Sequence, residues 1–181
     1  IYGYARQDRK DQPRVPITAK LVANLLVAAG ANRLLTMDLH AAQIVGYFDI
    51  PVDHLHADPV ITDYLCGKHF ADPVVVSPDT GSVKKAYSYA QRFGCGLAIG
   101  AKQRKSGSEV EAYSLVGDVK GKDVIMIDDL TSTCGTLCAA ANLCAKFGAG
   151  SVHAAVTHSQ LDDTGLARLR GSAITELIVT D

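Results

Sequence analysis

Two adjacent carboxylates followed by a turn of small, hydroxyl-bearing residues form the stretch of this sequence most suited to chemistry. Asp128 and Asp129 end an apolar run, and residues 131–136 read Thr-Ser-Thr-Cys-Gly-Thr. Hydroxyl groups and an approachable glycine backbone suit a phosphate group, whereas carboxylates accept hydrogen bonds from sugar hydroxyls or hold a metal ion. The stretch therefore predicts a sugar-phosphate site. The alternative is an ordinary strand-to-helix turn in which Asp and Thr cap the helix.

A buried strand and a helix must position this stretch. Residues 124–127 form a short apolar run that is typical of a buried parallel strand, and residues 137–147 have a helical pattern. The turn would then lie at the carboxyl end of a strand, where open α/β sheets bind ligands. The free N–H groups of the following helix would attract an anion to the same place. Residues 113–119, joined to this strand by the turn at 120–122, predict a hairpin with it.

Acidic and imidazole side chains follow two other predicted strands. Asp38 and His40 lie at the carboxyl end of the strand predicted for residues 33–39, and Asp79 follows the apolar run 74–76. Carboxylate and imidazole groups can hold a metal ion beside a phosphate. The simpler interpretation is a structural histidine in the first case and a turn aspartate after proline in the second.

A basic loop follows the strand predicted for residues 96–100. It contains Lys102 and Arg104 in a segment rich in Gly and Ser. A closing loop of this kind would bring cations to a phosphoryl group as charge develops on its oxygens. The alternative is a solvated polar loop, which is the usual role of a run of charges.

The chain contains an internal repeat. Seven residues between Thr18 and His40 recur in the same order between Thr136 and His158, each 118 positions later. The repeat predicts two related domains, and the helix start at Asp58-Pro59 places their boundary near residue 57. Only the second copy is preceded by the acidic, small-residue turn.

Strand and helix patterns alternate along most of the chain. This alternation predicts an α/β protein with mainly parallel sheets. One of the helices opens near Thr18, and the helical spacing of its apolar residues predicts a buried stripe along it. The stripe consists of Leu21, Val22, Leu25, Leu26 and Ala29.

The composition excludes some classes of protein. The chain has 181 residues, 48% of them hydrophobic, and a net charge of −1, which provides no basic face for nucleic acid. No apolar run approaches the roughly 18 residues of a membrane span. Five cysteines without a C-x-x-C pair are typical of buried thiols in a reducing cytosol, so we expect a cytoplasmic protein. Because residue 1 is Ile and the chain stops just after a predicted strand, we expect both ends to be missing from a longer protein.

Six segments, in this order, resemble the ribose-phosphate pyrophosphokinase family. They are Gly3–Arg9, Asp38–Ala41, Val75–Asp79, Lys102-x-Arg104, Asp128-Asp129 and Thr133–Thr136. The resemblance implies two tandem type I phosphoribosyltransferase-like domains with mainly parallel sheets, the first of them incomplete. Residues 1–56 would be the carboxyl-terminal part of an ATP-side domain, and residues 57–181 a phosphoribosyl-binding domain truncated at its end. The family also implies a homo-oligomer, in which dimers assemble into hexamers or other multimers.

The resemblance further implies a reaction. Pyrophosphate would pass from ATP to the 1-hydroxyl of ribose 5-phosphate, giving phosphoribosyl pyrophosphate and AMP for nucleotide biosynthesis, with Mg²⁺ required. The residues implied are Lys102, Arg104 and His40 for catalysis; Arg6, Gln7, Asp8 and His40 for ATP; His40, Asp79 and Asp38 for the metal ion; and Arg104, Asp128, Asp129, Ser132, Thr133, Cys134, Gly135 and Thr136 for ribose 5-phosphate.

Some positions depart from the family's pattern. Ser82 stands where a second Gly is usual, and Ala101 precedes Lys102 in place of an Asp. Thr131 and Ser132 replace an apolar residue and an Asp. Because of these changes, a second candidate is a non-catalytic homologue that associates with active subunits. Production of AMP would distinguish an active enzyme from such a homologue. A third candidate is an ordinary phosphoribosyltransferase, which would consume a nucleobase rather than ATP but would not explain the repeat.

Overall fold

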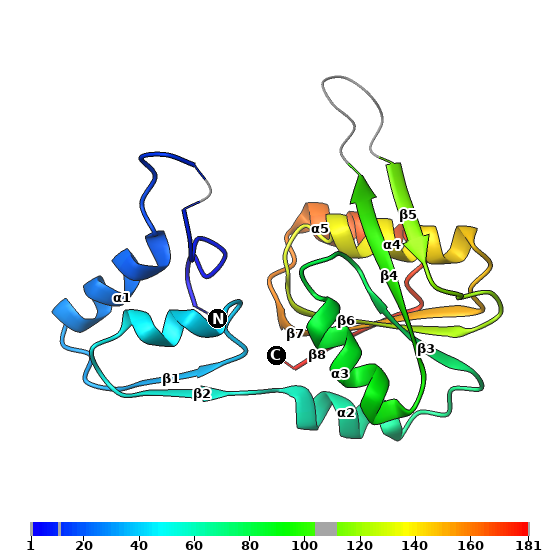
Figure 1. Cartoon of the computed structure of the whole chain (residues 1–181), viewed down its shortest axis with the longest axis horizontal. Helices are drawn as coiled ribbons and strands as arrows, with labels where there is room; N and C mark the ends of the chain where they lie inside the picture. The colour runs from blue at the N-terminus through cyan, green and yellow to red at the C-terminus, as the bar shows by residue number, and fades with distance from the viewer. Residues whose placement is uncertain (1, 11, 104–111, 181) are drawn as a thin grey trace. The chain divides into compact units, whose positions relative to one another are not determined.

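The chain divides into two compact units, Ile1–Pro59 and Val60–Asp181. The computed structural model describes residues 2–10, 12–103 and 112–180, with the side chains of 101–103, 112 and 113 excepted (Figure 1). Each unit is described by itself below. The assignment of residues 1–56 and 57–181 to two related domains stays a prediction.

The first unit is a small α/β arrangement. It contains α1 (Thr18–Ala28), β1 (Leu34–Met37), the 3₁₀ helix η1 (Ala42–Tyr47) and β2 (Val52–Leu55). β1 and β2 pair in parallel, with Leu34 opposite Val52. Its core is made by Tyr2, Ala5, Ala19, Ala23, Leu39, Ile44 and Phe48.

Helix α1 does not bury the stripe that its leucines predicted. Leu21 is 49% exposed and Leu25 is 59% exposed, whereas Ala19 and Ala23 are fully buried. The small alanine side chains let the helix backbone come close to the rest of the unit, and the Tyr2 hydroxyl donates to the Ala19 carbonyl oxygen at 2.7 Å. Of the predicted stripe, Val22 does pack against the core, so the apolar spacing indicated the correct element but placed its leucines on the wrong face.

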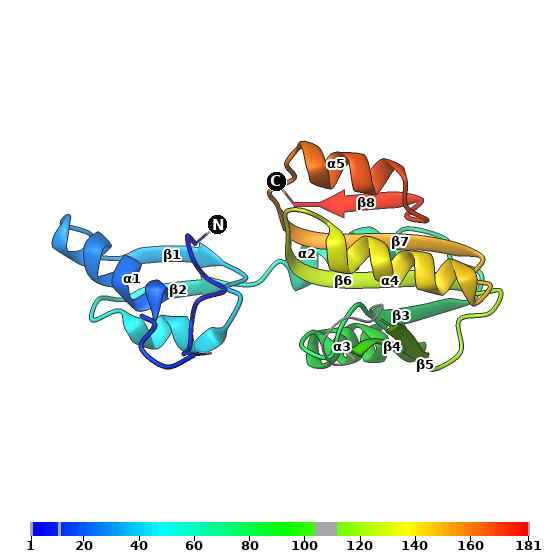
Figure 2. The ribbon, with the colours of Figure 1, turned by 90° about the horizontal axis from the view of Figure 1, so that it is seen from above.

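The second unit is a six-stranded sheet with helices on both faces. Its strand order is β5-β4-β3-β6-β7-β8, and every pair is parallel except β4 with β5. Figure 2 shows this order across the sheet. The elements are α2 (Asp58–Cys66), β3 (Pro73–Ser77), α3 (Val83–Phe93), β4 (Gly96–Gln103), β5 (Ala112–Val116), β6 (Asp123–Thr131), α4 (Gly135–Lys146), β7 (Ser151–Ser159), α5 (Asp163–Arg170) and β8 (Glu176–Val179). The predicted α/β fold with a mainly parallel sheet is confirmed.

The predicted hairpin between residues 113–119 and the strand at 124–127 is wrong. β5 pairs instead with β4, with Tyr113 opposite Lys102. β6 has no free edge to offer, because β3 and β7 lie on either side of it in parallel pairs. Pairing with two parallel neighbours buries the apolar run of β6, where residues 124–127 are at most 1% exposed.

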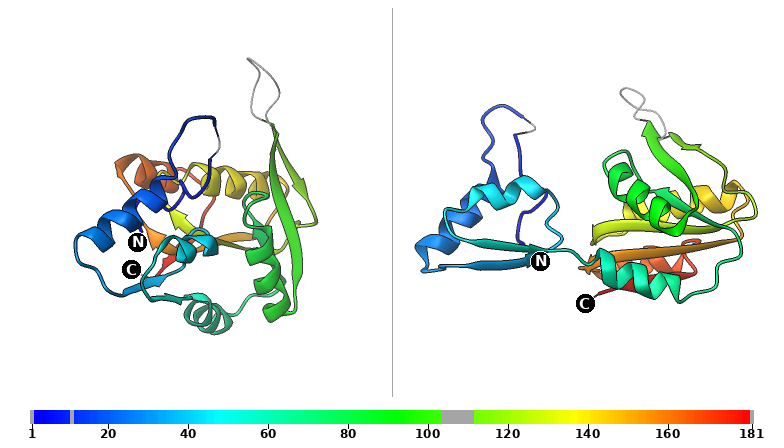
Figure 3. Two further views of the ribbon diagram at one scale, coloured as in Figure 1. Left: turned by 60° about the vertical axis from the view of Figure 1, so that its left-hand side comes forward. Right: turned by 60° about the horizontal axis from the view of Figure 1, so that its bottom comes forward.

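The sheet changes its direction of winding between β3 and β6. The chain steps from β3 through α3 to β4 on one side, and from β6 through α4, β7 and α5 to β8 on the other. Because such crossovers are right-handed, the two sets of helices must cover opposite faces. The ribbon shows α4 and α5 on one face and α3 on the other (Figures 1 and 3). A crevice opens outside the carboxyl ends of strands at such a point, where α/β sheets bind ligands.

Candidate functional site

The carboxyl ends of β3 and β6 bring two of the predicted acidic loops together. Asp79 follows β3, and Asp128 and Asp129 lie near the end of β6. The Ser82 hydroxyl lies 3.5 Å from Asp128 Oδ1 and so links the two loops. Sequence reasoning singled out Ser82 only as a departure from a pattern and missed this contact. These loops form the candidate site of the second unit.

Negative charge is concentrated at this point. Burial, reinforced by the neighbouring Asp129 and Asp79 carboxylates, raises the pKa of Asp128 to about 7. The backbone N–H of Asp129 donates to Asp128 Oδ1 at 2.9 Å, which holds the carboxyl group in place. A carboxyl group kept close to its pKa at neutral pH is suited to hydrogen bonding with sugar hydroxyls.

The Asp79 carboxylate is held by its own turn. Its Oδ1 accepts hydrogen bonds from the backbone N–H groups of Gly81 at 2.8 Å and Ser82 at 3.0 Å. The Ser77 hydroxyl donates to the Asp79 carbonyl oxygen at 2.6 Å. These bonds fix Oδ1 within the protein and leave Oδ2 as the atom that could approach a cation.

The turn between β6 and α4 ends in a left-handed residue at the start of a helix. Cys134 adopts a left-handed conformation, with φ of 53°, and precedes the first turn of α4 without making a side-chain cap. Left-handed residues take part in the concave groups of N–H donors that bind anions. The first N–H groups of a 12-residue helix then remain open to an anion. Ser132 is half-buried, and Thr133 and Thr136 are exposed.

The predicted cationic loop is described only in part. The backbone of Lys102 lies on β4, opposite Tyr113 of β5. The Lys102 side chain and all of Arg104 lie outside the described residues. Their contacts with phosphate stay predictions.

The predicted ATP residues of the first unit differ in exposure. Arg6 and Gln7 are exposed, and the Gln7 carbonyl accepts a hydrogen bond from Ala19 N at 3.1 Å. Asp8 is 7% exposed, and its carboxylate accepts a hydrogen bond from the Gln43 amide. The Tyr47 hydroxyl donates to the Asp8 carbonyl oxygen. Asp8 therefore ties its loop to η1, which makes it a support of the loop that presents Arg6 and Gln7.

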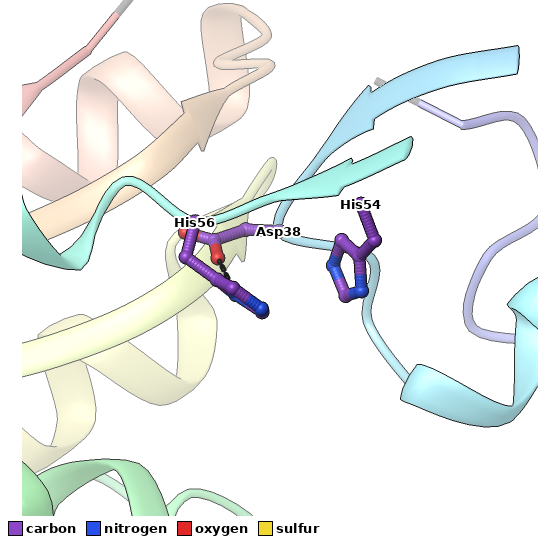
Figure 4. Close-up of side chains that lie close together, drawn as sticks. All are labelled: Asp38, His54 and His56. Atoms are coloured by element: carbon purple, nitrogen blue, oxygen red, sulfur yellow. Dashed lines mark hydrogen bonds and ion pairs between the residues drawn. The ribbon is translucent and has the colours of Figure 1, made fainter. Parts of the chain in front are cut away.

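Asp38 lies in a cluster with two histidines that sequence reasoning missed. Asp38 Oδ1 is 3.1 Å from His56 Nδ1, and Asp38 Oδ2 accepts a hydrogen bond from Ala57 N at 3.3 Å. The His54 and His56 rings lie 4.4 Å apart between centroids, beside this carboxylate (Figure 4). Their spacing of two along an extended segment, which places both on one face, was the signal available in the sequence. His40, the predicted ligand, is exposed just beyond Leu39.

Asp38, His54 and His56 lie close enough to hold a metal ion, because one ligand atom from each lies within 4.8 Å of the others. The Leu39 backbone N–H donates to His54 Nε2 at 3.0 Å, so the neutral ring carries its proton on Nδ1. Burial first, and then the neighbouring His56, lower the pKa of His54 despite the opposing Asp38 carboxylate, and the lowered pKa favours that neutral form. Both oxygens of Asp38 also accept hydrogen bonds, as those of metal-ligating carboxylates commonly do. The same hydrogen bonds support the loop after β1, where Asp38 itself has a φ of 41°.

Replacing Asp38 by alanine is expected to lower the free energy of unfolding by about 1–3 kcal/mol, because Ala57 N–H loses a buried acceptor. Asp53→Ala is the matched control. Asp53 pairs with Arg33 at 2.7 Å, but the two side chains are 40% and 68% exposed, so its loss should lower the stability much less than the loss of Asp38. Denaturant unfolding measures both values. Equal losses in the two variants would contradict the role given to Asp38.

A groove of about 410 Å³ lies elsewhere in the second unit, between α2 and β8. Its lining is mostly apolar and includes Val60, Tyr64 and Val179. Its acidic residue, Glu176, is bonded to Lys68 at 2.8 Å and to His153 Nδ1 at 3.2 Å. The hydroxyl groups of its lining donate within the protein, that of Tyr64 to Glu176 and that of Thr180 to a backbone carbonyl oxygen. Among the described residues that line the groove, there is no Lys or Arg to attract a phosphate group. Among the described helices, none is both long and apolar enough to cross a membrane.

Comparisons with known proteins cover both units. Residues 59–170 match the family model described as "Phosphoribosyl transferase domain", and residues 1–30 match "N-terminal domain of ribose phosphate pyrophosphokinase". The chain is 53% identical to a ribose-phosphate pyrophosphokinase of Rhodopirellula baltica and 52% identical to one of Helicobacter hepaticus, over 99% of its own length in each case. It spans 58% of the length of each of these curated relatives.

Solved structures extend the comparison. The phosphoribosylpyrophosphate synthetase from Mycobacterium smegmatis superposes with a TM-score of 0.90 at 46% identity, covering 99% of this chain and 58% of that one. An orotate phosphoribosyltransferase from Aeropyrum pernix covers 68% of this chain and 71% of its own, with a TM-score of 0.51 at 20% identity. That more distant likeness shows a shared fold and nothing more.

Proposed function

Because this chain belongs to the ribose-phosphate pyrophosphokinase family, we propose that the protein carrying it transfers pyrophosphate from ATP to the 1-hydroxyl of ribose 5-phosphate. The products would be phosphoribosyl pyrophosphate and AMP. The observation that carries the proposal is the junction of β3 and β6. There, the Asp128 and Asp129 carboxylates stand beside a turn that leads into the uncapped start of α4, and this combination suits a sugar phosphate.

The second unit would bind ribose 5-phosphate. Asp128 and Asp129 would accept hydrogen bonds from the ribose hydroxyls, and the turn from Ser132 to Thr136 would hold the 5-phosphate. The open N–H groups at the start of α4 support this division, because phosphate is attracted there and repelled by the carboxylates. Held in this way, the 1-hydroxyl would be oriented for in-line attack on the β-phosphorus.

The first unit would contribute to ATP binding. Arg6 and Gln7 are exposed side chains on a loop that Asp8 secures to η1, and they are proposed to contact the nucleotide. His40, exposed after β1, is proposed to contact the ATP phosphates or their metal ion. Lys102 and Arg104 of the second unit would neutralise charge on the transferring group.

Mg²⁺ is the metal ion that this function implies. It would neutralise charge on the phosphates of ATP when bound. Asp79 fits the role of a ligand, because it is half-buried, its turn fixes Oδ1, and its charge lies close enough to act on the Asp128 carboxylate. Asp38 also fits this role, because its carboxylate lies in a group with the two histidines of its cluster, and the ligand atoms of this group are within 4.8 Å of one another. We therefore propose Asp79, Asp38 and His40 as ligands.

The other candidate functions receive less support. A non-catalytic regulatory homologue is not favoured, since relatives about half identical to this chain are named as pyrophosphokinases. An ordinary phosphoribosyltransferase would not account for the match of residues 1–30 to the pyrophosphokinase N-terminal domain. A homo-oligomer of dimers and a cytoplasmic location stay predictions.

A direct assay tests the proposed function. The purified protein is expected to release AMP from ATP only when ribose 5-phosphate is present, and excess chelator is expected to abolish the reaction until Mg²⁺ is restored. Chromatography of AMP and phosphoribosyl pyrophosphate measures both products. ATP consumption without any need for ribose 5-phosphate, or products formed only with a nucleobase, would refute the proposal.

A further inference from the structure

Helix α5 lies directly against the turn between β6 and α4. The backbone N–H of Gln160, just before this helix, donates to the Thr131 carbonyl at 2.8 Å. Gly165 comes so close that a Cβ built on it would lie 2.2 Å from the Ser132 carbonyl oxygen. Arg168 Nη1 donates to the Thr133 carbonyl at 3.0 Å. Three consecutive carbonyl oxygens of the turn thus contact the segment from Gln160 to Arg168.

These contacts decide where the N–H groups of the turn point. In a trans peptide, the C=O and the N–H of the same unit point in opposite directions. Because the Thr131 and Thr133 carbonyls face the α5 segment, the N–H groups of Ser132 and Cys134 face away from it. That is the arrangement in which a turn can cradle a phosphate.

Arg168 also brings charge to the turn. Its Nη1 lies 3.6 Å from the position that a Cβ on Gly135 would occupy, so the guanidinium group stands beside the first residue of α4. Arg168 is exposed, and one of its five N–H donors is used by Thr133. A cation beside the positive end of a helix strengthens the attraction of that end for an anion.

We propose that Arg168 is a positioning residue for ribose 5-phosphate. By holding the Thr133 carbonyl, it orients the N–H groups of the turn toward the 5-phosphate, and its charge favours the bound anion. This proposal rests on the proposed function of the same turn. It assigns a role to a residue 35 positions away from its partner in the sequence.

Substitutions of Arg168 test this role in the complete protein. Arg168→Ala is expected to raise KM for ribose 5-phosphate by about tenfold, while KM for ATP changes less than about twofold. The reason is that the substitution removes both the hydrogen bond that orients the turn at Thr133 and a positive charge beside the phosphate. Arg168→Lys keeps a charged donor and should recover most of the affinity. Arg168→Gln keeps a donor without charge and should lie between the two.

Arg170→Ala is the matched control, since Arg170 is exposed in the last turn of the same helix. It should leave both KM values and the thermal midpoint unchanged, because its side chain is exposed. Arg168→Ala should lower the midpoint only slightly, because it removes one hydrogen bond of an exposed side chain. Equal increases in the two KM values for Arg168→Ala, or the same KM for ribose 5-phosphate as in the wild type, would overturn the proposal.

Calorimetric titration with ribose 5-phosphate separates this proposal from the one on which it rests. Binding by the wild-type protein and weaker binding by Arg168→Ala would support both. Equal binding by the two proteins would refute only the role of Arg168. Failure of the wild-type protein to bind ribose 5-phosphate would overturn the proposed function, and this proposal with it.

Discussion

Replacing Lys102 by alanine is expected to lower turnover by about 100- to 1000-fold while KM for ATP stays within about twofold. The reason is that charge on the oxygens of the transferring group is greatest in the transition state, so a cation there contributes little to ground-state binding. The strand pairing in the sheet supports a place for Lys102 near the transferring group. Ser77 at the end of β3 pairs with Ile99, so β4 continues past β3 and carries Lys102 beyond the carboxyl end where Asp79 lies.

Steady-state kinetics with ATP and ribose 5-phosphate measure this effect. Lys84→Ala is the control, because Lys84 is an exposed cation on α3. Its turnover should match that of the wild type. A Lys102→Ala variant that kept its turnover within a few-fold, or that lost ATP affinity to the same extent as turnover, would show that this lysine has another role.

Asp128→Asn is expected to weaken binding of ribose 5-phosphate and to stabilise the metal-free protein. Loss of a charged acceptor should raise KM for ribose 5-phosphate by about 10- to 100-fold. At pH 8, the same change should raise the free energy of unfolding by about 1–3 kcal/mol, because it removes a buried charge that lies beside other carboxylates. A buried charged residue that lowers the free energy of unfolding is typical of a functional site.

The dependence of this stabilisation on pH follows from the raised pKa. Folded Asp128 has a pKa of about 7, compared with 3.8 for an isolated carboxyl group. The stability that its protonated form contributes is complete below the lower value and is lost as the pH rises through 7. The advantage of Asn over Asp should therefore be small near pH 4, grow up to pH 7 and then level off.

Denaturant unfolding in the presence of a chelator, repeated from pH 4 to pH 8, measures this dependence. Asp63→Asn is the control, because Asp63 is an exposed residue on α2. It should change the stability by less than about 0.5 kcal/mol at every pH. A stabilisation by Asp128→Asn that did not vary with pH would contradict the raised pKa.

Much of the candidate site could be predicted because its chemistry is local in sequence. The apolar run of residues 124–127, the two acids after it and the turn with Gly135 occupy one continuous stretch. A strand that ends in such a turn can only deliver it to a carboxyl edge. The same reasoning identified Asp79, which follows the apolar run of β3. Whether these residues bind the proposed ligands stays a prediction.

Contacts between distant segments could not be predicted in the same way. The positions of His54 and His56 around Asp38 depend on the pairing of β1 with β2, and the support of the turn by Arg168 depends on the packing of α5. Helix α1 shows the same limit, since its leucines indicated one face and its alanines pack into the core. Periodicity reports that a face is apolar but does not say which neighbour will cover it.

The sequence by itself determined the α/β class and the chemical groups at each strand end, because apolar runs, turns and acid pairs are properties of neighbouring residues. Only the tertiary structure decided the partner of β5, the direction in which the turn's N–H groups point and the pKa of Asp128. Strand order, burial and the distances between charges arise when segments far apart in the chain pack together. No local pattern encodes them.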